Sequence, residues 1–423
     1  MTQPKRGKLV RVALAFLALT VPIAIRAEQP KVIRLGALYP LTGNIASTGL
    51  DCRRGVELAV DIINGKYDLD LPLAQSEGLP NLGGAKIEVV FSDTKGEPKN
   101  GLAEAERLVT QEKVVALIGA YQSSVTKTAS QTAERLQIPY VCSDSSSPTL
   151  TQRGFKYFFR VSPHDGLFAR DQFHFLKDLE KAKGQKVRTV ALLYENTEFG
   201  SNVGKEATKV AKEMGYEIVA DISYSANATD VTSEVGRLIK ANPDVLMHAS
   251  YITDAILFTK TFKEMGFHPK GYMTYSGYIE PAYLPAVKSD GNGVVIRSTF
   301  ALDLARSKPL VAKVAELFKK KYGMDMSENA ARSFTAPFVV ADAINRAKAT
   351  DPEAIVKALL DTNLAGNQVV YPWEGVKFDP QTHQNVHARG ILVQVQNGEY
   401  VTVWPFESAA KEVIWPFPDW KRR

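Results

Sequence analysis

The chain alternates short apolar runs with segments of helical periodicity, and this alternation constrains its fold more than any other feature. The run Val32–Leu38 is typical of a strand, and after a glycine-bearing loop apolar residues recur at helical spacing from Val56 to Ile63. Further strands, each followed by a helix, are expected at 87–91 and 114–118, and a short strand at 140–142 ends this first series. A second series has strands at 187–194, 217–222 and 245–248, each again followed by a helix. Strands that alternate with helices form parallel sheets covered on both faces. The sequence therefore predicts an α/β protein of two lobes.

The length of the chain agrees with a division into two lobes, and its net charge bears on the kind of partner it binds. Chains longer than ~250 to 300 residues usually form more than one domain, and this chain has 423. Five of its 52 basic residues lie in the first 27 positions, which hold no acid, so the remaining chain has 47 basic and 46 acidic residues, a net charge of +1. A charge near zero argues against a nucleic-acid partner.

The first 27 residues have the three parts of a secretory signal. A basic start through Arg11 precedes the apolar run Val12–Ile25, and the small residue Ala27 precedes Glu28. The run has 14 residues, whereas a transmembrane helix needs ~20, so an uncleaved anchor is the lesser alternative. We expect cleavage near Ala27 and export of the mature protein.

Motifs that would indicate enzymatic or metal chemistry are missing from the sequence. It contains no phosphate-binding, dinucleotide-binding, hydrolase-elbow or zincin motif. His383 and His387 are four residues apart, but the nearby Pro380 favours a loop with a solvated histidine pair over a metal site. The two cysteines, Cys52 and Cys142, could form one disulfide or remain as buried thiols. We expect neither a metal nor a cofactor.

Hydroxyl side chains gather where two neighbouring first-lobe strands end. The candidates are Tyr121, Gln122 and Ser123 after the strand at 114–118, and Asp144, Ser145 and Ser146 after the strand at 140–142. In open α/β sheets ligands bind beyond the carboxyl ends of the strands, and the start of a helix, expected at or near Ser124, favours an anion. Such serines also cap helices and form turns. Two runs at adjacent strand ends nevertheless predict a carboxylate site.

Two segments interrupt the alternation. Tyr67–Gly84 is rich in glycine and proline and is interpreted as a long surface loop, either a lid over the site or an insertion without consequence. The tail from Trp404 to Arg423 has three prolines and three tryptophans and is expected to pack as an extended segment on one lobe.

Several stretches resemble the type I periplasmic solute-binding proteins, specifically the Leu/Ile/Val-binding branch that feeds ABC importers. These are the opening at 33–43, the helix at 54–59, the stretch 117–119 followed by two serines, and the stretch 147–154. The resemblance covers essentially the whole mature chain. It implies two Rossmann-like lobes joined by a three-strand hinge, with crossings near Ser162, Phe300 and Ala388. The N-terminal lobe would comprise 28–162 and 301–388, and the C-terminal lobe 163–300 and 389–423.

The resemblance also implies roles for individual residues. Ser123 matches the serine that binds the ligand carboxylate, Ser146 matches a hydroxyl residue that assists it, and Asp144 matches a position whose backbone carbonyl faces the ammonium group. From the second lobe, Tyr251 and Phe199 fall at positions that touch the ligand.

Two positions depart from the pattern of the branched-chain amino-acid binders. Thr48 stands where they have an aromatic residue, and Ser276 stands where they have the glutamate that pairs with the α-ammonium. A serine cannot supply that charge, which leaves Glu280, Glu195 and Glu198 as possible replacements. The sequence thus predicts the carboxylate half of an amino-acid site more firmly than its ammonium half.

The function implied by the resemblance is periplasmic solute binding without catalysis. The ligand would be a branched-chain or related amino acid or a small carboxylate, trapped in the interlobe cleft by hinge closure and presented to an inner-membrane ABC permease. A sensor that presents the closed form to a membrane receptor would have the same fold. A secreted hydrolase using a serine from 143–147 is a remote alternative, because no histidine stands in a triad context.

Overall fold

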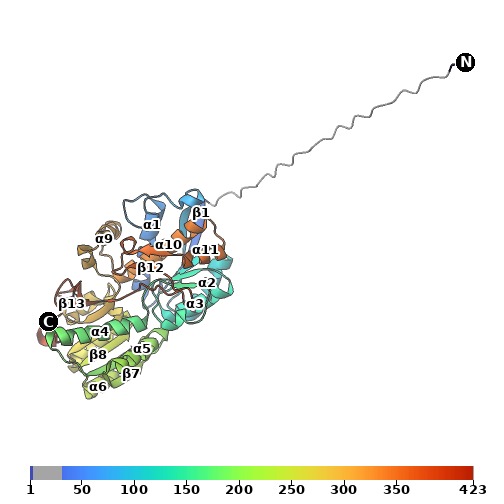
Figure 1. Ribbon diagram of the computed structural model, residues 1–423. Coiled ribbons are helices and arrows are strands. Elements are labelled where there is room, and N and C mark those ends of the chain that lie inside the picture. Colours follow the sequence, from blue (N-terminus) through green and yellow to red (C-terminus); the bar gives the residue numbers. More distant parts are fainter. Residues whose placement is uncertain (3–30, 423) are drawn as a thin grey trace.

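The computed structural model describes residues 1–2 and 31–422 of the chain, so the predicted signal segment lies almost wholly outside the described residues. The described part forms two lobes, each a sheet with helices packed on it (Figure 1). The prediction of a two-lobed α/β fold is therefore confirmed.

The first lobe is built on a five-stranded parallel sheet of order β2-β1-β3-β4-β5. Its strands are β1 (Val32–Tyr39), β2 (Lys86–Asp93), β3 (Ala116–Gly119), β4 (Tyr140–Cys142) and β5 (Phe158–Arg160). On one face lie α1 (Ala46–Asn64) and, from far along the chain, α10 (Glu328–Ala347); on the other lie α2 (Pro98–Thr110) and α3 (Ser123–Arg135). Both faces are buried, as the continuous apolar strands require.

The helices α1 and α10 pack closely because a glycine of α1, Gly55, lies at their contact. A Cβ on Gly55 would lie 2.1 Å from the carbonyl oxygen of Ala330. The neighbouring α9 (Pro309–Tyr322) and α11 (Pro352–Leu360) complete this side of the lobe. The close contact fixes the start of α10, which carries residues of the cleft described below.

The second lobe is built on a seven-stranded sheet of order β14-β13-β10-β9-β8-β6-β7. Five strands are parallel: β6 (Thr189–Glu195), β7 (Glu217–Tyr224), β8 (Val245–Ser250), β9 (Gly271–Ser276) and β10 (Val295–Ser298). The strands β13 (Ile391–Gln396) and β14 (Glu399–Trp404) add an antiparallel edge. The covering helices are α4 (Asp165–Lys183) and α5 (Glu198–Met214) on one face, and α6 (Thr232–Ala241) and α7 (Ile252–Met265) on the other, with the short α8 (Tyr283–Val287) beside α7.

The chain passes between the two sheets at three places. After β5 it enters the second lobe, after β10 it returns, and after the small β11 (Asn363–Ala365) and β12 (Gly375–Lys377) pair it passes to β13. Two of the crossings are hydrogen-bonded to each other, since the Asn385 N–H donates to Arg160 O and the Asn385 side chain donates to Val161 O. Sheet membership supports the lobe boundaries near 162, 300 and 388, which stay a prediction.

The segment Tyr67–Gly84 was expected at the surface, and this expectation is wrong for its apolar side chains. Leu69, Leu71, Leu79 and Leu82 are buried in the core beside α1 and α10. Asn81 donates two hydrogen bonds to Asn345, near the C-terminal end of α10, from its backbone N–H to the side-chain oxygen and from its side-chain amide to the backbone carbonyl. The cleft residues lie at the opposite end of that helix, so the segment is an integrated part of the lobe and not a lid.

The C-terminal tail packs on the second lobe, as expected. The Trp420 indole donates to Phe267 O at 2.9 Å, and Phe417 packs edge-on against Tyr272 with ring centroids 5.5 Å apart. Within residues 31–422, no helix is long and apolar enough to cross a membrane.

Both cysteines are free thiols with 0% exposure, which decides between the two alternatives that the sequence left open. Because neither thiol reaches solvent, we expect no rapid reaction of the native protein with a thiol reagent such as Ellman's reagent. In denaturant without reductant, two thiols should titrate per chain. A single rapidly reacting thiol in the native state, or none in denaturant, would contradict the buried, unpaired arrangement.

Candidate functional site

The two lobes meet over a small cavity at the carboxyl ends of the central strands. It is lined from the first lobe by Tyr121, Ser123, Asp144 and Ser146, from the second by Phe199, Tyr251 and Ser276, and by two residues the sequence did not single out, Arg297 and Arg332. The lobes lie closed, because the enclosed volume is ≈ 10 Å³, about enough for one water molecule. Seven of the nine predicted site residues therefore come together.

The first-lobe serines are placed by a helix start and a strand end. Ser123 is the first residue of α3, and its Oγ accepts a hydrogen bond from the Ser147 N–H at 3.2 Å. The hydroxyl hydrogen of Ser123 therefore remains available to donate into the cavity. Together with the unpaired N–H groups of the helix start, it forms an anion-binding position.

Gln122 and Ser145 do not line the cavity, in contrast to the expectation from sequence. The Ser145 hydroxyl lies within hydrogen-bonding distance of Ala120 O at 2.8 Å and Tyr121 O at 3.0 Å, and the Gln122 side chain donates to Gly96 O at 3.3 Å. Both side chains satisfy backbone carbonyls of the surrounding loops. They therefore stabilise the loops around the cavity without lining it.

Asp144 reaches the cavity, but its carboxylate is occupied within its own lobe. It accepts hydrogen bonds from Tyr39 and Ser143 on one oxygen and from Ser333, at 2.9 Å, on the other. Burial raises the pKa of Asp144. Both carboxylate oxygens are thus hydrogen-bonded within the first lobe.

Aromatic rings of the second lobe form the facing wall. Phe199 and Tyr251 lie with ring centroids 5.4 Å apart, and Tyr251 approaches Tyr121 of the first lobe at 5.8 Å. Tyr251 immediately precedes α7, and Gly277 lets the end of β9 pass close to it, since a Cβ there would lie 2.4 Å from the Tyr251 carbonyl carbon. The wall can stack on a flat or apolar part of a ligand.

Direct hydrogen bonds join the lobes beside the cavity. The Tyr121 hydroxyl shares a 2.7 Å hydrogen bond with Ser276 and donates to Glu280 at 2.9 Å, and Thr48 donates to the other oxygen of Glu280. A further contact between the lobes is the ion pair of Glu198, which precedes the lining residue Phe199, with Lys127 at 2.9 Å. Thr48, one of the two positions that depart from the pattern of the branched-chain amino-acid binders, thus joins the two lobes.

None of the three acids considered as an ammonium partner is free to act as one. Glu280 is held by Thr48 and Tyr121, and Glu198 by Lys127 and Thr149. Glu195 accepts hydrogen bonds from the Thr197 and Gly200 N–H groups, which cap the start of α5. None of these acids lines the cavity. The ammonium half of an amino-acid site therefore has no free carboxylate among these candidates.

Sequence reasoning missed Arg297 and Arg332, which are 2% and 1% exposed. Arg297 stands in β10 of the second lobe and Arg332 in α10 of the first, and both guanidinium groups contact one oxygen of Glu328, at 3.2 and 3.5 Å. Burial lowers the pKa of Arg297, whereas for Arg332 the attraction of Glu328 and Asp144 outweighs burial and the pKa rises. For Arg297 the available signal was its position directly after the apolar run 294–296, within a stretch typical of a strand.

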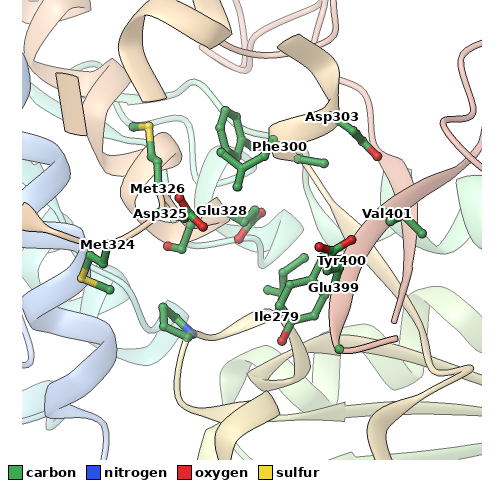
Figure 2. Close-up of a pocket in the computed structure, with 15 residues that line it drawn as sticks. Ile279, Phe300, Asp303, Met324, Asp325, Met326, Glu328, Glu399, Tyr400 and Val401 are labelled. Atoms are coloured by element: carbon green, nitrogen blue, oxygen red, sulfur yellow. The ribbon is translucent and has the colours of Figure 1, made fainter. Parts of the chain in front are cut away.

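A larger hollow of ≈ 480 Å³ lies beside the cavity and is shown in Figure 2. Its walls come from both lobes, with Phe300, Met326 and Tyr400 among the apolar residues and Asp303 and Glu399 at the rim. Glu328 also lines it, in the middle of the view. The arginine-bound acid therefore stands between this hollow and the closed cavity.

The histidine pair at 383 and 387 lies in a loop, as predicted, but it is not a solvated pair. His383 is buried and stacked on Phe159 with ring centroids 4.3 Å apart, while His387 pairs with Glu374. Among residues 31–422 no group of histidine, cysteine and acidic side chains could hold a metal ion.

Comparison with known proteins identifies similar chains over most of the length. The family model of the periplasmic binding proteins matches residues 32–399. The "Leu/Ile/Val-binding protein homolog 7" of Brucella suis is 29% identical, with 95% of this chain and 99% of that protein covered.

Solved structures show the same fold at lower identity. A branched-chain amino acid transporter substrate-binding protein of Streptococcus pneumoniae, in complex with isoleucine, gives a TM-score of 0.71 at 22% identity and covers 91% of this chain and 100% of that one. A solute-binding protein of Rhodopseudomonas palustris, in complex with 3,4-dihydroxybenzoic acid, gives 0.71 at 19% identity, with 93% and 100% covered.

The buried Glu280 predicts a pH dependence of lobe closure. Burial raises the pKa of Glu280 to about 7, with Asp51 and Glu328 adding repulsion and Thr48 and Tyr121 opposing the rise. When the lobes separate, water reaches the carboxyl and its pKa returns toward ~4.3. The closed form therefore holds the proton more tightly, and its advantage is full below the lower pKa and lost as pH rises through about 7.

Small-angle scattering should accordingly give a smaller radius of gyration at pH 5.5 than at pH 8. Glu280→Gln is the matched control, because it keeps the size of the side chain and removes the titration of Glu280. Its radius should differ less between the two pH values than that of the wild type, while Asp51 and Asp165, whose pKa burial raises to about 6, still titrate in this range. An unchanged wild-type radius would count against the raised pKa of Glu280 as a contribution to closure.

Proposed function

Because the chain belongs to the periplasmic binding protein family, we propose that it is the solute-binding component of an ABC importer. It binds a branched-chain or related amino acid or a small carboxylate between its lobes. The observation that carries this proposal is the meeting of Ser123 and Ser146 with Phe199, Tyr251 and Ser276 across one cavity. A helix start and two hydroxyls on one side take a carboxylate, and aromatic rings on the other take the remainder of the ligand.

Binding proceeds by closure of the lobes and requires no covalent chemistry. The closed cavity of ≈ 10 Å³ is too small for an amino acid, so the ligand enters an open form and the lobes close to a wider separation around it. Contacts from both lobes exist together only in the closed form, so the ligand shifts the population toward it. The hydrogen-bonded crossings at Arg160 and Asn385 are the natural place for the rotation.

The ligand is best assigned by its carboxylate. Of the two solved proteins described above, one is in complex with isoleucine and the other with an aromatic acid, and these two ligands share a carboxylate. In this chain the carboxylate position at Ser123 is present, whereas Glu195, Glu198 and Glu280 are all engaged elsewhere. A buried ammonium without a partner is costly. This contrast favours acids that lack the amine.

The compartment and the partner follow from the family. A periplasmic binding protein works outside the inner membrane and delivers its ligand to an ABC permease within it. The predicted signal with cleavage near Ala27 agrees with that location.

Serine hydrolysis finds no support at the site. In the described chain no hydrogen bond joins a histidine to a hydroxyl of the serines at 143–147, which instead contact backbone carbonyls, Asp144, Thr126, Thr149 and Glu198. A nucleophilic serine needs an adjacent base.

The proposal is tested by matched pairs of acids. Leucine and phenylalanine are compared with 4-methylpentanoate and 3-phenylpropionate, which keep the carbon skeleton and lack the amine. We expect the deaminated acids to bind as well or better by calorimetry, and a bound acid to reduce the radius of gyration in small-angle scattering. Tight binding of the amino acids alone would show that another group pairs with the ammonium. Binding with an unchanged radius would reject closure.

Ser123→Ala should weaken binding of whichever of these acids binds most tightly. Loss of a hydrogen bond to a charged group costs ~1.5 to 3 kcal/mol, or roughly ten- to a hundredfold in affinity. Ser145→Ala is the control, because its hydroxyl contacts only protein groups and its loss should lower the melting temperature with less effect on affinity. Equal affinities for wild type and Ser123→Ala would remove Ser123 from the site.

A further inference from the structure

The cleft holds two guanidinium groups that the proposed amino-acid or monocarboxylate ligand does not use. We propose that Arg297 and Arg332 form a second anion position, so that the natural ligand is a small dicarboxylate without an amine. This inference rests on the proposed function and specifies the ligand class of the same cleft. One carboxylate lies at Ser123 and Ser146, and the other at the arginine pair.

Each arginine has a hydrogen-bond donor that no protein group satisfies. Among the described residues, Nε of Arg297 and Nη2 of Arg332 are buried and have no partner. Both residues line the cavity, and both are almost completely buried. Unpaired buried donors are costly, particularly on a charged group. A carboxylate placed between them satisfies both donors by charge-assisted hydrogen bonds.

The remaining contacts of the two side chains hold them in place for this role. Arg332 donates through Nε to Ser143 O at 3.1 Å, and the guanidinium of Arg297 lies 4.5 Å from the ring centre of Phe168. One oxygen of Glu328 serves both arginines, so the pair has two cations around one directly bonded acid. Asp165 adds a further negative charge nearby without a direct hydrogen bond to either arginine. The two guanidinium groups are thus fixed in orientation, and each keeps one donor without a protein partner.

The composition of the cavity wall favours acceptors on the ligand. Hydroxyls and guanidinium groups belong to seven of the nine lining residues: Tyr121, Ser123, Ser146, Tyr251, Ser276, Arg297 and Arg332. Asp144, the one acid in the wall, is already hydrogen-bonded on both oxygens. Phe199 is the one lining side chain without a polar group, and no aliphatic side chain lines the cavity. Such a wall suits a compact molecule with an acidic group at each end better than a branched aliphatic chain.

The wild-type protein tests this inference against three matched series. Succinate, glutarate and adipate are compared with butyrate, valerate and hexanoate, which lack the second carboxylate, and with glutamate, which adds an amine to glutarate. We expect at least one dicarboxylate to bind at least tenfold more tightly than its monocarboxylate, and glutarate to bind more tightly than glutamate. Leucine and 4-methylpentanoate are measured in the same assay.

Arginine variants then locate the second carboxylate. Arg297→Lys and Arg332→Lys keep the charge and remove the unpaired donor, so each should weaken the preferred dicarboxylate roughly ten- to a hundredfold and leave the matched monocarboxylate within about threefold. Arg346→Lys, on the same helix α10 and away from the cavity, is the control and should change neither affinity. If Arg332→Lys does not fold, Arg297→Lys and the wild-type series decide.

The outcomes separate this inference from the proposed function. Leucine or monocarboxylates binding as tightly as every dicarboxylate, with closure in scattering, would overturn the second anion position and leave solute binding intact. An unchanged preference in Arg297→Lys would also overturn it. Failure of every compound in all series to bind or to change the radius of gyration counts against the proposed function as well.

Discussion

The closed arrangement depends on a buried ion pair that joins the two lobes. Arg297 belongs to the second sheet, whereas Glu328 and Arg332 begin the long helix of the first lobe, and their charged groups meet with almost no exposure to water. Thr299, in the crossing between the lobes, donates to the same oxygen of Glu328 at 2.8 Å. Buried charges are tolerated only when paired, and leaving one unpaired costs ~3 to 5 kcal/mol. The lobes therefore cannot move freely past each other at this point.

The parallel sheets explain why the remaining polar groups meet at the same place. Parallel strands end at the same edge, and each is followed by a loop and a helix start, so Ser123, Ser146 and Tyr251 are all brought to the cleft by chain geometry. A loop residue next to a helix start can offer both a side chain and unpaired N–H groups. The candidate ligand site thus lies where the fold leaves backbone N–H groups without a hydrogen-bond partner.

Much of the fold and seven of the nine residues that line the cavity follow from the sequence, for reasons that particular residues make clear. Alternation of apolar strands and amphipathic helices predicts the sheets, and serines after β3 and β4 predict the carboxylate position. Tyr67–Gly84 is a loop, as its prolines and glycines predict, but its spaced leucines are buried in the core with residues of α1 and α10, and this burial was not predicted. Arg297 and Arg332 escaped notice because an isolated charge in a sequence normally indicates a solvated face. Their partner Glu328 is 31 residues from Arg297, so the pairing is a property of the assembled lobes.

The interlobe hydrogen bonds also determine how selective the cleft can be. Tyr121 donates to Glu280 and shares a hydrogen bond with Ser276, so the lobes already gain contacts on closing without help from a ligand. A ligand adds to the closed form only what it contributes beyond those contacts. A ligand that only occupies the cavity stabilises the closed form little, because it forces the lobes apart and the hydrogen bonds of Tyr121 to the second lobe are then lost. A molecule that satisfies Arg297 and Arg332 pairs two buried donors that no protein group meets, and in the proposed binding mode this difference between ligands gives the selectivity.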